Sequence, residues 1–192
     1  DGVIVAPASF PSTLSAITLN GLTPLFVDIE WDTLNFDLNQ IESLLEDSLG
    51  FWPRNEPKAI FVAPVLGNPP DMDRLEAIAA KHNLLLIGDL CDSLGSEWRC
   101  KPLNSRFVAS TCSLFASHHI SCGLGGMVSS NNPDVIRAVR SMSSWAKDCY
   151  CVGAGNLLPN GVCGRRFSNW LPDQPDLIVD HRYTYTSSQS YN

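Results

Sequence analysis

Cysteines provide the largest set of potentially reactive or metal-binding side chains in this chain of 192 residues. Between Cys91 and Cys149 lie 57 residues, and one residue separates Cys149 from Cys151. Zinc ligands usually have about two to four residues between them, so the close pair does not favour zinc. Because free cysteine is also a common small core residue, the spacing alone leaves metal binding and core packing open. The full set is Cys91, Cys100, Cys112, Cys122, Cys149, Cys151 and Cys163.

A carboxylate and a pair of histidines are the other candidates for chemistry. Asp89 follows the apolar run Leu84–Ile87. A carboxylate just past a buried strand lies where ligand sites form in α/β proteins, although it could equally cap a turn. His118 and His119 stand between Ser113 and a glycine-rich stretch. Histidine can serve as a general base, but a pair in a loop is by itself weak evidence for that role.

Six short apolar runs predict the strands that would position these residues. They are nearly continuous in Val, Ile, Leu and Phe, as buried strands of a parallel sheet tend to be. Helical patterns fall between most of them, which predicts an α/β fold with a mostly parallel, doubly wound sheet. The predicted strands are Val3–Ala6, Pro24–Val27, Ala59–Val62, Leu84–Ile87, Val108–Phe115 and Met127–Ser129, and the predicted helices are Thr13–Leu19, Leu38–Leu49, Met72–His82 and one that begins at Pro133.

The ends of these elements and the last residues complete the expected organisation. Asp37 is placed to cap the helix that begins at Leu38, with Gln40 as its capping-box partner. The last two predicted strands have no helix between them, which predicts an antiparallel pair around the histidines. Residues 1–150 are therefore expected to form the central part of an α/β domain, followed by an irregular cysteine-containing segment, 151–192.

The composition disfavours several classes of partner. The chain carries 20 acidic and 13 basic residues, a formal net charge of −7, and no run of Lys or Arg. That balance disfavours nucleic-acid binding. No apolar run has transmembrane length, and the first residues lack the basic start and apolar stretch of a signal peptide. We therefore expect a cytoplasmic protein whose cysteines bind metal rather than form disulfides.

The segment Ser113–Gly126 has the sequence Ser-Leu-Phe-Ala-Ser-His-His-Ile-Ser-Cys-Gly-Leu-Gly-Gly. It resembles the active-site segment of the DegT/DnrJ/EryC1/StrS sugar aminotransferases, which implies the large domain of a pyridoxal phosphate (PLP)-dependent transferase of the aspartate aminotransferase type I kind. At the position of His118 that family has a lysine, which forms an imine with the cofactor. Histidine cannot form this imine, so His118 implies a base that moves a proton while the cofactor stays as pyridoxamine phosphate. The nucleotide-sugar 3-dehydrase branch makes this exchange of lysine for histidine.

The cysteines resemble the ligand pattern of the iron–sulfur members of that branch, the CDP-4-keto-6-deoxy-glucose 3-dehydrases of lipopolysaccharide dideoxysugar biosynthesis. Those enzymes bind a 2Fe–2S cluster through a cysteine, a gap of the same length, a Cys-x-Cys pair and a fourth cysteine, and four thiolates are what such a cluster needs. The resemblance implies Cys91, Cys149, Cys151 and Cys163 as the ligands. Eleven residues separate Cys151 from Cys163, which is a longer gap than in the family.

The resemblance also implies roles for the remaining site residues. Asp89 would bind the protonated pyridine nitrogen of the cofactor, Ser113 its phosphate, and Asp92 would face the cofactor ring. Phe10 matches an aromatic residue that stacks on that ring, with an ordinary core phenylalanine as the alternative. Asn192 matches a residue that reaches the phosphate of a neighbouring subunit, which implies a homodimer.

The implied activity is removal of the C3 hydroxyl from a CDP- or dTDP-linked 4-keto-6-deoxyhexose. The implied partner is an NADH- or NADPH-dependent flavin/iron–sulfur reductase, and the chain is expected to be a fragment of the large cofactor domain. An aminotransferase homologue is one alternative, but it would need a lysine near position 118, and the motif contains none. A non-catalytic cofactor- or metal-binding remnant is the other, since Gly88 and Leu124 stand where the family usually has glutamates.

Overall fold

The computed structural model describes residues 1–46 and 56–143. Residues up to Asn132 belong to one compact unit, and the helix α4, Pro133–Ser143, belongs to a second unit. The predicted domain boundary near residue 150 and the segment 151–192 lie outside the described residues. No helix in the described part of the chain is long and apolar enough to cross a membrane.

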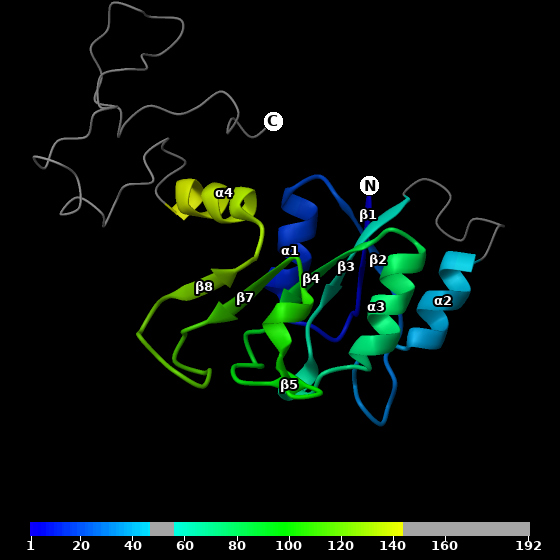
Figure 1. The fold of residues 1–192 in the computed structure, drawn as a ribbon, viewed down its shortest axis with the longest axis horizontal. Helices are drawn as coiled ribbons and strands as arrows, with labels where there is room; N and C mark the ends of the chain where they lie inside the picture. Colours follow the sequence, from blue (N-terminus) through cyan, green and yellow to red (C-terminus); the bar gives the residue numbers. More distant parts are fainter. Residues whose placement is uncertain (47–55, 144–192) are drawn as a thin grey trace, which may run out of the picture. The chain divides into compact units, whose positions relative to one another are not determined.

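Six strands form one sheet in the first unit (Figure 1). They are β1 Gly2–Val5, β2 Thr23–Phe26, β3 Pro57–Val62, β4 Leu85–Asp89, β7 Ala109–Ser113 and β8 Gly126–Ser129. Their order across the sheet is β2-β1-β3-β4-β7-β8. Neighbouring strands pair in parallel except β8, which is antiparallel to β7. The predicted mostly parallel α/β fold and its one antiparallel pair are therefore confirmed.

Helices cover both faces of this sheet, as a doubly wound fold requires. Helix α1, Pro11–Leu19, packs through Ile17 against Val3 and Val5 of β1. Helices α2, Leu38–Glu46, and α3, Met72–Lys81, contribute to the larger core on the other face, which contains Ile4. Because successive side chains of a strand point to opposite faces, neighbouring residues of β1 belong to different cores.

The first turn of α2 shows which part of its predicted cap is correct. The Asp37 carboxylate accepts hydrogen bonds from the backbone N–H groups of Asn39 at 2.9 Å and Gln40 at 3.2 Å, which confirms the cap. The predicted capping-box role of Gln40 is wrong. The N–H of Asp37 already donates to the carbonyl of Asp28 at 2.9 Å, and the Gln40 side chain accepts from the N–H of Asp28 instead.

Two short strands between β4 and β7 in the sequence have no counterpart in the sequence prediction. Strands β5, Glu97–Trp98, and β6, Lys101–Pro102, form a small antiparallel hairpin. Its turn residues Arg99 and Cys100 have φ angles of 49° and 59°. Non-glycine residues seldom adopt this left-handed conformation, and the usual Asn-Gly or Asp-Gly signal of such a turn is missing. The sequence therefore carried no sign of the hairpin.

Candidate active site

A cavity of about 560 Å³ opens at the carboxyl ends of the parallel strands. Four connecting segments contribute to its wall. Phe10 follows β1, Leu66 follows β3, Cys91 follows β4 and His118 follows β7. Ligands of open α/β sheets bind at this edge, so the cavity is the candidate active site.

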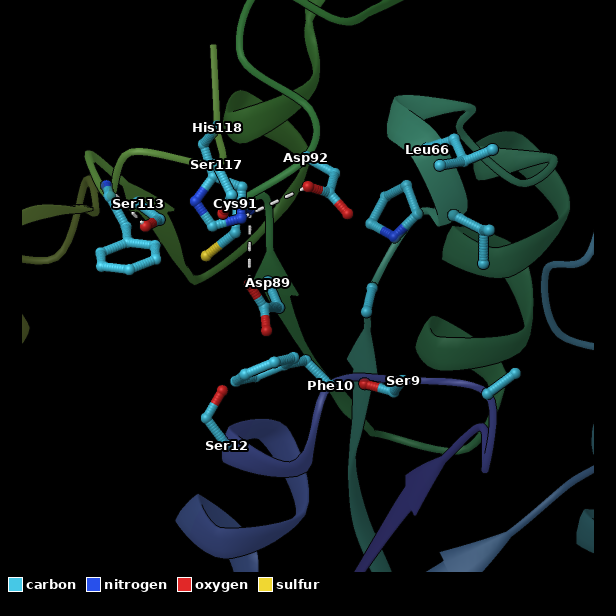
Figure 2. Close-up of a pocket in the computed structure, with 15 residues that line it drawn as sticks. Ser9, Phe10, Ser12, Leu66, Asp89, Cys91, Asp92, Ser113, Ser117 and His118 are labelled. Carbon is cyan, nitrogen blue, oxygen red and sulfur yellow. Dashed lines mark hydrogen bonds and ion pairs between the residues drawn. The ribbon is translucent and has the colours of Figure 1, made fainter. Parts of the chain in front are cut away.

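The structure brings six of the predicted site residues together around this cavity (Figure 2). The six are Phe10, Asp89, Cys91, Asp92, Ser113 and His118. The remaining four, Cys149, Cys151, Cys163 and Asn192, lie outside the described residues, so their roles stay predictions. These six residues come from distant parts of the sequence but line one cavity.

Asp89 is held by three hydrogen-bond donors. It is the last residue of β4, whereas the sequence had predicted that this strand ends at Ile87. One carboxylate oxygen, Oδ2, accepts from the Thr13 hydroxyl at 2.8 Å. The other, Oδ1, accepts from the Thr111 hydroxyl at 3.3 Å and from the backbone N–H of Cys91 at 3.4 Å. The carboxylate is thus fixed from a helix, a strand and a loop.

His118 lies in the loop that joins β7 to β8. Its backbone N–H donates to the carbonyl of Phe115 at 3.0 Å, which closes a turn. The ring nitrogen Nε2 lies 3.4 Å from Oδ1 of Asp92 (Figure 2). The other ring nitrogen, Nδ1, is buried and has no hydrogen-bond partner among the described residues. The imidazole therefore has its Nε2 side directed toward a carboxylate on the cavity wall.

Phe10 and Ser113 present an aromatic ring and a hydroxyl to the same cavity. The Phe10 side chain is 76% exposed, so the alternative of an ordinary core phenylalanine is wrong. Its ring lies across the cavity from His118 in Figure 2. Ser113 ends β7, and its hydroxyl accepts from the N–H of Phe115 at 3.1 Å. That hydroxyl keeps its own proton available for donation to a bound anion.

Cys91 lines the cavity beside Asp89 and His118. Burial is the largest cause that raises the pKa of its thiol to about 12, and the neighbouring Asp89 carboxylate adds to the effect. Within residues 1–46 and 56–143, no group of three or more His, Cys, Asp or Glu side chains could hold a metal ion. Cys91 as a cluster ligand therefore stays a prediction.

The two departures from the family pattern lie away from the cavity wall. A Cβ atom at Gly88 would lie 2.8 Å from Cδ2 of Phe107, a buried core residue, so the missing side chain makes room for that ring. Gly88 precedes Asp89 on β4 and therefore faces the opposite side of the sheet. Leu124 is 84% exposed in the segment between β7 and β8. Neither residue lines the cavity.

Thr13 is a site residue that the sequence prediction missed. Its side chain is 2% exposed and lies four residues before Ile17, the buried apolar residue of the same helix. Positions four apart share one face of a helix. A polar residue on the buried face was therefore a usable signal, because buried hydroxyl groups normally have hydrogen-bond partners.

Comparison with known proteins agrees with this fold. Residues 1–150 match the DegT/DnrJ/EryC1/StrS aminotransferase family, and the chain belongs to that family. It is 36% identical to the lipopolysaccharide biosynthesis protein RfbH of Salmonella typhimurium, over 100% of this chain and 41% of that protein. It is 34% identical to a dTDP-4-dehydro-2,6-dideoxy-D-glucose 3-dehydratase of Saccharopolyspora spinosa, over 100% of this chain and 38% of the relative.

A solved structure from the same group resembles this one closely. Escherichia coli GDP-4-keto-6-deoxy-D-mannose-3-dehydratase with bound hydrated PLP superimposes with a TM-score of 0.69 at 26% identity, over 96% of this chain and 42% of that one. The chain thus spans about two fifths of the length of these relatives. Family membership and the type of fold, which the sequence had predicted, are confirmed.

Proposed function

We propose that the protein is a nucleotide-sugar 3-dehydrase that removes the C3 hydroxyl of a CDP- or dTDP-linked 4-keto-6-deoxyhexose. The observation that carries the proposal is His118, at the position of the family's lysine, on the wall of the cavity that Asp89 also lines. No lysine of the described segments lines this cavity. A site with a histidine in that place can move protons but cannot attach a cofactor as an imine. Two of the relatives described above are 3-dehydratases of nucleotide-linked sugars.

The side chains of the cavity fit pyridoxamine phosphate or PLP. Asp89 offers a carboxylate to a pyridinium N–H, the Phe10 ring is uncovered and can stack, and Ser113 offers a hydroxyl to a phosphate. A cavity of about 560 Å³ is also large enough for a cofactor of this size. When bound, such a cofactor supplies an electron sink for the carbon that loses or gains a proton.

The residues of the chain then have separate tasks. Asp89 would keep a proton on the ring nitrogen of a bound cofactor, because an ionised carboxylate stabilises the adjacent positive charge. His118 would accept the proton from C4′ of that cofactor at Nε2, since Nδ1 is buried among the described residues. The Asp92 carboxylate, 3.4 Å from Nε2, stabilises the positive charge that His118 acquires.

The proposal includes a 2Fe–2S cluster bound by Cys91, Cys149, Cys151 and Cys163. Such a cluster would supply electrons one at a time, and replacement of the C3 hydroxyl by hydrogen is a net reduction that consumes them. The support is the spacing of the cysteines and the position of Cys91 on the cavity wall. An NADH- or NADPH-dependent flavin/iron–sulfur reductase would deliver the electrons. We further propose that the protein is a cytoplasmic homodimer in which Asn192 contacts the phosphate of the cofactor in the partner subunit.

An aminotransferase is the second candidate, because the family that the chain matches is named an aminotransferase family. It would make an amino sugar from the same class of 4-keto sugar, with an amino acid as nitrogen donor. It would also need a lysine from outside the described residues, where Lys147 lies. Product analysis separates the two candidates, since a 3-deoxy sugar supports the dehydrase and an amino sugar supports the aminotransferase.

Proton exchange at C4′ of pyridoxamine phosphate tests the role of His118. We expect His118→Ala to slow the exchange by about 10²–10⁴-fold, the usual contribution of a general base, while cofactor binding persists. The adjacent histidine, His119, is exposed and does not line the cavity, so His119→Ala is the matched control. If exchange survives His118→Ala but is lost in His119→Ala, the base is His119 and the assignment to His118 is wrong.

A further inference from the structure

We propose that Thr13 is a positioning residue that fixes the Asp89 carboxylate for the ring nitrogen of the cofactor. The inference rests on the proposed function, since it concerns the same cavity. Thr13 lies in the first turn of α1, and its hydroxyl donates to Oδ2 of Asp89 at 2.8 Å. The two residues are 76 positions apart in the sequence, so the bond joins helix α1 to the end of β4.

The surroundings of Thr13 indicate that its hydroxyl is required for its hydrogen bond to Asp89. The side chain is 2% exposed, and a valine of the same shape would fill the same space. A buried hydroxyl without a partner destabilises a fold, so the partner determines whether a threonine is tolerated there. Exposed Ser15 and Thr18 of the same helix donate to carbonyls of that helix, at 2.9 and 3.2 Å. Thr13 instead reaches across to the cavity carboxylate.

The distribution of donors on Asp89 shows what the Thr13 bond accomplishes. An ionised carboxylate oxygen can accept about two hydrogen bonds. Oδ1 already accepts from Thr111 and from the N–H of Cys91, whereas Oδ2 accepts from Thr13. One acceptor position therefore remains on Oδ2, the oxygen that Thr13 fixes. Donors on both oxygens also restrict rotation of the carboxylate, which aims the remaining lone pair.

The same turn of α1 connects Asp89 to the aromatic wall of the cavity. The N–H of Thr13 donates to the carbonyl of Phe10 at 3.0 Å. Phe10 is the exposed ring proposed to stack on the cofactor. The carboxylate and the ring are thus held relative to each other through one residue. Loss of the Thr13 hydroxyl should weaken cofactor binding even though the threonine does not touch the cofactor.

Cofactor affinity of four variants tests this role. The dissociation constant of PLP is measured by fluorescence on the protein freed of cofactor, with thermal unfolding as the check on folding. We expect Thr13→Val to weaken binding about 10-fold, as a hydrogen bond to a charged group would, and Thr13→Ser to restore it to within about threefold. If Thr13→Val does not fold, Thr13→Ala is measured in its place. Thr18→Val removes a hydroxyl from an exposed position of the same helix and should leave affinity unchanged.

A double variant separates positioning from a general effect on the fold. Combined with Asp89→Ala, Thr13→Val should change the dissociation constant by less than about twofold, because the two residues act through one bond. The same loss in both backgrounds would overturn the inference, as would wild-type affinity in Thr13→Val. If wild-type protein binds neither PLP nor pyridoxamine phosphate, the proposed function is wrong and the inference falls with it. If Asp89→Ala loses the cofactor but Thr13→Val does not, only the inference is wrong.

Discussion

Asp89 and Asp92 both line the cavity, but their surroundings differ. Asp89 accepts three hydrogen bonds, while the Asp92 side chain is 56% exposed and faces His118. We expect Asp89→Asn to weaken PLP binding and slow C4′ exchange at least about 10-fold, because a neutral amide cannot hold the pyridinium proton by charge. Asp92→Asn should retain binding and lose part of the exchange rate. Equal small effects of both substitutions would show that Asp89 only stabilises the end of β4.

The thiol of Cys91 should be unusually unreactive in iron-free protein. Burial, reinforced by Asp89, raises its pKa to about 12, whereas Cys100 and Cys122 are exposed. Because the thiolate is the reacting form, iodoacetamide at about pH 8 should modify Cys91 at least about 10 times more slowly than the other two. These rates are measured by mass spectrometry of peptides from samples taken at successive times of the reaction. Equal rates at the three cysteines would contradict the raised pKa.

The same shift in pKa has a consequence for stability. The folded protein keeps the Cys91 proton at a pH at which the unfolded chain has already released it. The folded state then binds more protons, so its stability falls as the pH rises from the unfolded pKa toward about 12. Below the unfolded pKa the thiol is protonated in both states and contributes no pH dependence.

At the scale of the elements, β4 shows how a glycine makes room for a core residue. A Cβ at position 88 would lie 2.8 Å from the buried Phe107 ring. We expect Gly88→Ala to lower the free energy of unfolding by about 1–3 kcal/mol, the usual range for overpacking a core. Urea unfolding measures the change. Adding Phe107→Leu should recover part of the loss, and a Gly88→Ala variant with wild-type stability would contradict the close contact.

Much of this fold could be predicted from the sequence, because buried parallel strands and amphipathic helices leave strong local patterns. Ala59, Ile60 and Val62 of β3 are buried as those patterns indicated, and so are Met72, Leu75 and Ile78 of α3. Phe61 of the same run is partly buried. The β5–β6 hairpin was missed because its turn uses Arg99 and Cys100 in place of the usual glycine. Local patterns also cannot show which residues that are distant in the sequence contact each other in the fold.

The candidate site was predictable to the extent that motifs mark it. His118, Asp89 and Ser113 stand in segments with family-like neighbours, and the structure brings them to one cavity. The bonds that hold Asp89 come from Thr13 and Thr111, which belong to no such motif. Their partnership depends on packing α1 and β7 against the end of β4, and that arrangement follows from the whole fold.

Across the chain as a whole, the proposed function requires a 2Fe–2S cluster whose ligands come from distant parts of the sequence. Serine at Cys91, Cys149, Cys151 or Cys163 should lose or destabilise the cluster. Cys100→Ser and Cys122→Ser should keep the wild-type iron content, because these exposed cysteines match no ligand position. The longer gap before Cys163 predicts a more exposed cluster that is lost faster in air. Iron analysis after reconstitution without oxygen decides between these outcomes, and wild type without iron would contradict the proposed electron transfer.

If His118 has replaced the lysine that attaches the cofactor in the aminotransferases of this family, the protein cannot form an imine with PLP at that position. Borohydride reduction of the protein loaded with one equivalent of PLP, followed by peptide mass spectrometry, tests this replacement, because borohydride makes an imine to lysine permanent. We expect no pyridoxyl group on any lysine and full release of the cofactor on denaturation. A stoichiometric pyridoxyl group on Lys147, or on any other lysine, would contradict it.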